Sequence, residues 1–187
     1  WSGKRLRRAS VSYRQLYQDA FGFDPFTASL ETLAAPLADH GIQGDDLGRD
    51  DWLDLLMTHH LQQAFAPDQL LTILDFPASQ CALARINGTG SDAVAARFEL
   101  YWGNKELANG YHELTDAKEQ RERFENDNRR RLARGQNALP LDHYFLEALA
   151  QGLPDCAGVA VGVERLLMSM AGTEVISDVL AYGFDRA

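Results

Sequence analysis

The sequence predicts an α+β protein, in which helices flank an antiparallel sheet. Two observations lead to this prediction. Apolar residues recur at helical spacing in several stretches before residue 66. Two strand-like runs then meet at Gly103-Asn104, a dipeptide typical of a hairpin turn. Grouped helices followed by a hairpin favour an α+β arrangement over alternating strands and helices.

The elements before the hairpin begin with a basic segment, residues 1–10, which we expect to be poorly ordered. Helical spacing predicts helices over residues 10–21, 29–41 and 50–65. Pro36 is expected to interrupt the second helix. The third should present one stripe, made of Trp52, Leu55, Leu56 and His59. A strand over 69–76 and a flexible turn at Asn87-Gly88 complete this part.

After the hairpin, capping signals predict three more helices. Asp116, with Glu119 three residues later, opens a polar helix over 116–134. Asp142 caps a helix that ends before Gly152. The third covers 164–172 and follows GVAVGV, residues 158–163, which alternates as a strand does. We expect the valine face of that strand to belong to the core. The other face is nearly bare, which suggests that something lies flat against it.

Composition excludes several classes of protein. The chain has 187 residues, a formal net charge of −9 and two cysteines, Cys81 and Cys156. This length is enough for one domain with a sizeable core, and the acidic charge argues against a general nucleic-acid surface. Two cysteines are too few for a disulfide framework, so we expect reduced thiols in the cytoplasm. No run of about 18 apolar residues predicts a membrane span.

The hairpin carries the first candidate site. If the chain turns at Gly103-Asn104, Trp102 pairs with Lys105 and Tyr101 with Glu106. Glu99 then shares a face with Glu106 as a diagonal neighbour. A divalent cation such as Mg²⁺ carrying a phosphate would offset the repulsion between these carboxylates. Two solvated acids on an exposed face remain the alternative.

Two further candidates follow. Asn109 and Glu113 share a strand face and could receive an ammonium group, provided that a bulge at Asn109-Gly110 re-aims them relative to Glu106. Asn-Gly as a simple turn is the alternative. Arg165, in the first turn of a helix, could bind a phosphate. An ion pair with Glu164 or another nearby acid is its alternative.

These residues also resemble a known family. GVAVGVERLLM resembles motif 3 of class II aminoacyl-tRNA synthetases, and RFELYWGNKELANGYHELTDAKEQRERF resembles their lysyl subgroup. The elements FPASQ, ELANG, HELTDA and the closing DRA are most similar to the lysyl-tRNA synthetase paralogues that ligate (R)-β-lysine to elongation factor P. The resemblance covers residues 10–187.

The resemblance implies roles for individual residues. Glu99 and Glu106 would hold Mg²⁺ and ATP, and Glu106 with Leu107 would lie at the ATP contact. The nucleotide would pack on Gly162, and Arg165 would act catalytically on the ATP phosphates. The bare strand face would then be a floor for ATP and the aminoacyl group.

Three positions concern the amino acid. The resemblance implies that Asn109 and Glu113 receive the amino groups of lysine or β-lysine. Ala160 stands where lysyl-tRNA synthetases usually have glycine and the β-lysine ligases have alanine. One methyl group can redirect preference between close isomers, although a neutral exchange is the alternative.

The sequence departs from the family in lacking motif 1, which makes the dimer, and motif 2, whose arginine holds the α-phosphate. We therefore expect residues 1–187 to be the C-terminal portion of the catalytic domain, inactive alone and part of a homodimer when complete. Two other functions stay open: a lysyl-tRNA synthetase that charges tRNA, and a non-catalytic binding module.

Overall fold

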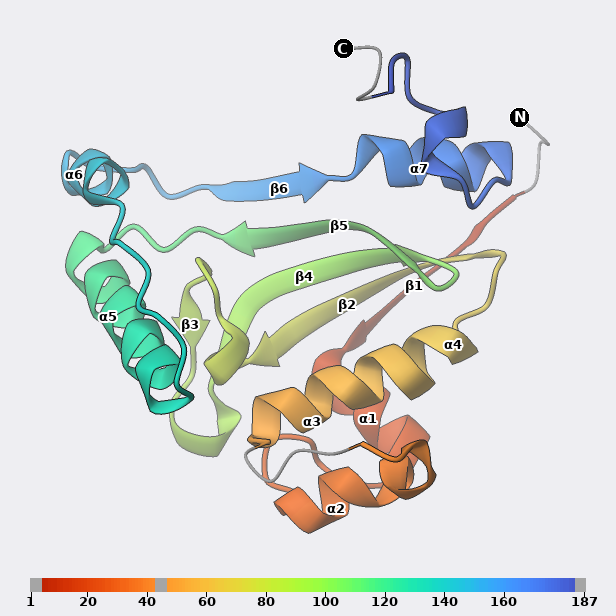
Figure 1. The fold of residues 1–187 in the computed structure, drawn as a ribbon, viewed down its shortest axis with the longest axis horizontal. Coiled ribbons are helices and arrows are strands. Elements are labelled where there is room, and N and C mark those ends of the chain that lie inside the picture. The colour runs from red at the N-terminus through yellow and green to blue at the C-terminus, as the bar shows by residue number, and fades with distance from the viewer. Residues whose placement is uncertain (1–4, 43–46, 184–187) are drawn as a thin grey trace.

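The computed structural model describes residues 5–42 and 47–183. This part of the chain forms one six-stranded sheet in the order β1-β2-β4-β5-β6, with β3 beside β4 (Figure 1). The strands are β1 (Arg7–Ser12), β2 (Gln69–Pro77), β3 (Ile86–Asn87), β4 (Val94–Trp102), β5 (Lys105–His112) and β6 (Ala157–Val161). The α+β prediction is confirmed. The first and last residues of the chain, including the closing DRA, lie outside the described residues.

Strand β1 corrects the expectation of a poorly ordered start. It pairs in parallel with β2, from Arg7 opposite Gln69 to Ser12 opposite Leu74, so the sheet is mixed rather than purely antiparallel. The Arg7 guanidinium also contacts the Asp68 carboxylate at 2.9 Å. The partner strand lies about sixty positions away along the chain, which is why local composition did not indicate a strand here.

The first helices pack against one face of the sheet. They are α1 (Tyr13–Phe21), α2 (Leu30–Ala34), α3 (Arg49–Leu56) and α4 (Gln62–Ala64). A 3₁₀ turn, Ala35–His40, continues α2 and contains Pro36, as expected. A π-helical segment, Met57–Leu61, joins α3 to α4 without a break. The predicted stripe of this helix was wrong in part, since Leu53, Leu56, Met57 and Leu61 are buried while His59 is exposed.

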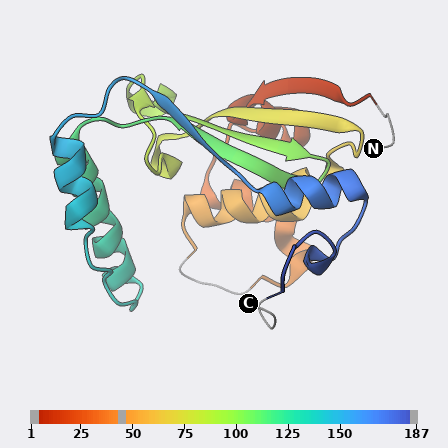
Figure 2. The same cartoon turned by 90° about the horizontal axis from the view of Figure 1, so that it is seen from above.

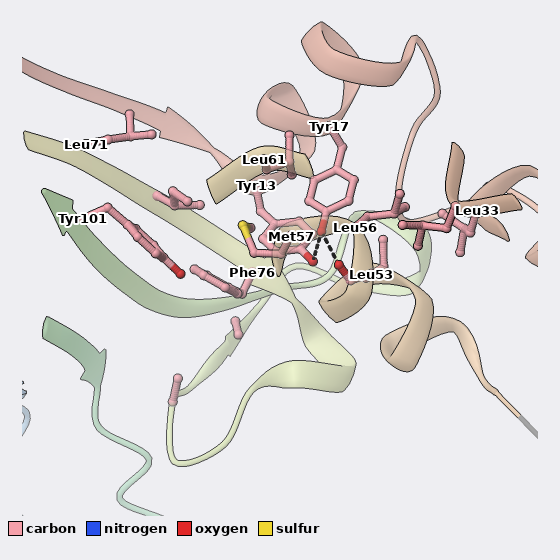
Figure 3. Packing of buried hydrophobic residues seen from close by; sticks show 14 residues of the cluster. Tyr13, Tyr17, Leu33, Leu53, Leu56, Met57, Leu61, Leu71, Phe76 and Tyr101 are labelled. Carbon is pink, nitrogen blue, oxygen red and sulfur yellow. Dashed lines mark hydrogen bonds between the residues drawn. The ribbon is translucent and has the colours of Figure 1, made fainter. Parts of the chain in front are cut away.

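The core lies between these helices and β2, β4 and β1 (Figure 3). Two stacked tyrosines occupy its centre. The Tyr13 hydroxyl donates to the Tyr17 hydroxyl at 2.9 Å, and the latter donates to the Leu53 carbonyl at 2.6 Å. Because both hydroxyls are buried and have partners, they join α1 to α3 without leaving a polar group unpaired.

Helices α5 (Ala117–Ala133) and α6 (His143–Ala150) form an arm at one end of the sheet (Figure 2). Asp116 and Asp142 cap them, as predicted. The arm projects from the sheet on the same side as α3 (Figure 2). The Arg134 guanidinium joins it to α3 through a two-pronged ion pair with Asp51, at 2.6 and 3.2 Å.

The carboxyl-terminal elements are β6, helix α7 (Val163–Ala171) and a 3₁₀ turn, Ile176–Asp178. The prediction that the valines of residues 158–163 belong to the core was wrong: Val159 and Val161 of β6 and Val163, the first residue of α7, are each at least half exposed. Among the described strands β6 pairs with β5 alone, and no described element covers its valine face. Cys81 and Cys156 are free thiols. None of the described helices is both long and apolar enough to cross a membrane.

Candidate active site

The hairpin of β4 and β5 forms as predicted, with Gly103 at a φ of 54° in its turn. Tyr101 lies opposite Glu106, and Leu100 lies opposite Ala108. Leu107 is therefore one extra residue, a β-bulge. The bulge was expected at Asn109-Gly110 and instead lies two residues earlier.

The bulge brings the candidate residues onto one face. Glu99 lies directly opposite Asn109 and shares its face with Tyr101, whose partner is Glu106. Across the next strand pair, Asn109 lies opposite Ala160 and Tyr111 opposite Gly158. Because strand faces alternate, Glu113 and Gly162 follow on this same face. Glu99, Glu106, Asn109, Glu113, Ala160 and Gly162 thus share one surface, which we call the site face, whereas Leu107, the bulge residue, is buried.

Glu99 is buried, and each of its carboxylate oxygens has one partner in the protein. One carboxylate oxygen contacts the Arg97 guanidinium in a short ion pair, and the other accepts a hydrogen bond from the Tyr101 hydroxyl at 2.6 Å. Burial, and then the charge of Glu99, raise the pKa of Tyr101 far above its ordinary value. Tyr101 therefore stays a protonated donor at physiological pH.

Glu106 is held loosely by two other candidates. Asn109 Nδ2 lies 3.5 Å from one carboxylate oxygen, and Arg165 Nη1 lies 3.6 Å from the other. The same guanidinium donates to the Glu106 carbonyl at 3.0 Å. The acid beside Arg165 is thus Glu106, on β5, and not Glu164 of its own helix. Arg165 is more than half exposed, so most of its guanidinium can still meet a phosphate.

Gly158 is bare because Glu113 lies against it. A methyl group added at Gly158 would collide with Oε1 of Glu113. Part of the floor expected for ATP and the aminoacyl group is therefore covered by a side chain of the protein. Ala160, the next residue on that face, is exposed. At Gly162 an added methyl would meet Arg165 only at an ordinary 3.5 Å, while its backbone N–H donates to the Leu107 carbonyl at 2.8 Å.

A cavity of about 430 Å³ opens between the site face and α3. Its lining includes Asp50, Asp54, Arg97, Glu99, Tyr101 and Glu106. Asp50 accepts from the Ser79 hydroxyl at 2.6 Å and Asp54 from the Gln80 amide at 2.8 Å. Burial raises the pKa of Asp54. Sequence reasoning missed both aspartates, because helical spacing puts them on one face without saying what that face meets.

Arg97 and Tyr101 were also not predicted as site residues, although their spacing from Glu99 indicates a shared face. Both lie two residues from Glu99 on a predicted strand, so alternation places all three on one face. A buried carboxylate needs partners, and an arginine and a tyrosine at these positions are suitable ones.

The donor set fits Mg²⁺, which prefers carboxylate and phosphate oxygens. A carboxylate offers about four acceptor sites, so Glu99 retains capacity beyond its two partners, and Glu106 is only weakly held. In the described part of the chain no three acidic, histidine or cysteine residues gather as a ready-made metal site. A metal here would depend on these two carboxylates together with the phosphates of a nucleotide.

Comparison with known proteins gives the family. The model of the class II tRNA synthetases specific for D, K and N matches residues 27–186. The chain belongs to this class II synthetase family. It is 47% identical over 181 residues to proteins named elongation factor P–(R)-β-lysine ligase from Salmonella paratyphi B, Salmonella heidelberg and Salmonella schwarzengrund. Those matches cover 95% of this chain and 55% of each relative. The chain thus spans about half the length of these relatives.

Proposed function

We propose that the protein containing this chain activates (R)-β-lysine with ATP and ligates it to a lysine of elongation factor P. The observation that supports the proposal is the site face, which carries two carboxylates suited to a metal and, on the same face, an amide and a carboxylate suited to an amine. The names of the 47% identical relatives supply the substrates.

In this proposal Glu99 and Glu106 hold Mg²⁺, which when bound neutralises charge on the ATP phosphates. Leu107 and Gly162 contact the nucleotide. Arg165 donates to the phosphates as the amino-acid carboxylate attacks the α-phosphate and pyrophosphate leaves. The protein acts by positioning and by compensating charge, without a covalent protein intermediate.

Asn109 and Glu113 receive the amino groups of the substrate. The Glu113 carboxylate forms an ion pair with a substrate ammonium, and Asn109 adds a directional hydrogen bond. Ala160 lies opposite Asn109 on the adjacent strand, so its methyl group borders the same place. We propose that this methyl group favours the β isomer.

A second candidate is a lysyl-tRNA synthetase that charges tRNA, since the matching family model covers the D, K and N enzymes. Ala160 and the net charge of −9 favour the protein acceptor. We further propose that the complete enzyme is a cytoplasmic homodimer, and that residues 1–187 alone are inactive because the sequence has no motif 2 arginine.

The test uses the full-length protein. Amino-acid-dependent ATP–pyrophosphate exchange should be faster with (R)-β-lysine than with α-lysine, and elongation factor P should gain the mass of one lysyl group. Glu106→Gln should abolish exchange, whereas Glu164→Gln, which alters the exposed acid next to Arg165, should leave it unchanged. Exchange with α-lysine alone, combined with aminoacylation of tRNA, would select the second candidate.

A further inference from the structure

We propose that Arg97 and Tyr101 are positioning residues that fix the carboxylate of Glu99 for metal binding; this inference rests on the proposed role of Glu99 as a Mg²⁺ ligand. Residues 97, 99 and 101 alternate along β4 and share the site face. Arg97 contacts one oxygen of Glu99 and Tyr101 contacts the other. The carboxyl group is thereby held from both sides.

Arg97 is itself fixed by two further contacts. Its Nη1 donates to the Gln80 carbonyl at 2.9 Å, and its guanidinium carbon lies 4.5 Å from the centre of the Phe76 ring. A guanidinium that lies over an aromatic ring and donates in two directions has little rotational freedom. The fixed guanidinium therefore restrains the orientation of the Glu99 carboxylate that it contacts.

Tyr101 is fixed in the same way from the opposite side. Its hydroxyl accepts from the Gln62 amide at 3.2 Å, and its ring meets Phe65 edge to face at 5.3 Å. Tyr101 and Phe76 both belong to the buried cluster drawn in Figure 3. Gln62 directly follows the π-helical segment Met57–Leu61, and such wider turns are frequent at functional sites. The hydrogen bonds from Gln62 to Tyr101 and from Tyr101 to Glu99 thus connect the orientation of Glu99 to this segment.

Charge gives a second reason for Arg97. Among the described residues that line the cavity there are four carboxylates and one cation, which is Arg97. Glu99 is 7% exposed, so its charge is largely removed from water and needs a partner. Arg97 supplies that partner at one edge of the carboxylate, and the remaining lone pairs stay available to a cation.

The experiment measures metal binding directly in the full-length protein. Binding of Mn²⁺ in the presence of ATP is followed by electron paramagnetic resonance, together with the Mg²⁺ concentration that gives half-maximal ATP–pyrophosphate exchange. Tyr101→Phe should weaken Mn²⁺ binding about tenfold, the lower end of effects seen when a residue that orients a metal ligand is removed. Arg97→Gln should weaken it at least as much, and Arg97→Lys should recover part of the loss.

Tyr13→Phe is the matched control. Tyr13 is also a buried tyrosine that lines the cavity, and its hydroxyl donates to Tyr17 rather than to Glu99. It should leave Mn²⁺ binding within about twofold of the wild type. Equal losses in both tyrosine variants would overturn the positioning role in favour of packing, and so would wild-type Mn²⁺ binding by Tyr101→Phe.

Glu99→Gln separates the remaining outcomes. It should weaken Mn²⁺ binding more than either neighbour does, and unchanged binding would overturn the inference because Glu99 would then not be a ligand. Failure of the proposed function is measured separately with the wild-type protein. In that case the wild-type protein would bind Mn²⁺ with ATP but would activate neither isomer of lysine.

Discussion

A Gly158→Ala substitution should weaken amino-acid activation without weakening the fold. The added methyl group would collide with Oε1 of Glu113, the far end of a flexible side chain, so the carboxylate must rotate away while the backbone stays in place. Alanine in a strand is favoured over glycine by roughly 0.5–1 kcal/mol. The free energy of unfolding should therefore remain within about 1 kcal/mol of the wild-type value.

The catalytic effect should be larger. A hydrogen bond to a charged group contributes about 1.5–3 kcal/mol, and about 1.4 kcal/mol corresponds to a factor of ten. If Glu113 receives the substrate ammonium, kcat/KM for the amino acid should fall about 10- to 150-fold. The assay is amino-acid-dependent ATP–pyrophosphate exchange in the full-length protein, with urea unfolding as the measure of stability.

Two controls make the reasoning refutable. In a Glu113→Ala background, Gly158→Ala should cause no further loss, since both changes remove the same interaction. Gly110→Ala, in contrast, should lower the free energy of unfolding, because its methyl would lie 2.5 Å from the Phe98 ring and 2.7 Å from the backbone oxygen of Gly158. Overpacking of that kind destabilises by about 1–3 kcal/mol. Wild-type kcat/KM in a stable Gly158→Ala variant would refute the role of Glu113.

Three other outcomes are expected in the full-length protein. Ala160→Gly should raise pyrophosphate exchange with α-lysine relative to (R)-β-lysine, by an amount up to the ~1–3 kcal/mol of one methyl group; an unchanged ratio would make Ala160 a packing residue. Arg134→Ala should lower stability by less than about 1 kcal/mol, since its pair with Asp51 is partly exposed, yet speed hydrogen exchange at the tip of the α5–α6 arm more than Arg130→Ala does. Asp54→Asn should be more stable than the wild type at pH 7. Burial raises the native pKa of Asp54, so native Asp54 binds its proton more tightly than the unfolded chain does and stability falls as pH rises through that pKa. Urea unfolding should show no difference in stability between Asp54→Asn and the wild type at a pH below the ordinary pKa of aspartate.

The parts of the fold that the sequence predicted depend on local chemistry. Gly103-Asn104 forms its turn whatever lies elsewhere, and Asp116 and Asp142 cap their helices by bonds to backbone amides two or three residues away. Strand β1 and the exposure of the β6 valines depend instead on partners distant in the chain. Alternation shows that Val159 and Val161 share a face, but it does not show whether another element covers that face.

The candidate site follows the same division. The pairing of Tyr101 with Glu106 could be derived from the hairpin turn, and that register alone put Glu99 and Glu106 on one face. The wall formed by Asp50 and Asp54 could not be derived, because the approach of α3 to β4 depends on packing of the whole core. Strand pairings within a few residues of a hairpin turn can therefore be predicted from the sequence, whereas contacts between a helix and a sheet cannot.

The bulge at Leu107 lies between these cases, and the sequence ELAN contains its signal. In a regular strand Glu106 and Asn109, three residues apart, would point to opposite faces, and so would the two apolar residues between them. One extra residue puts both polar side chains on the site face, while Leu107 and Ala108 are both buried. Two adjacent apolar residues between two polar ones thus indicate a bulge more directly than the Asn-Gly that follows. The bulge is also what allows a proposed metal ligand and a proposed substrate ligand to act from one strand, since without it either Glu106 or Asn109 would turn away from Glu99.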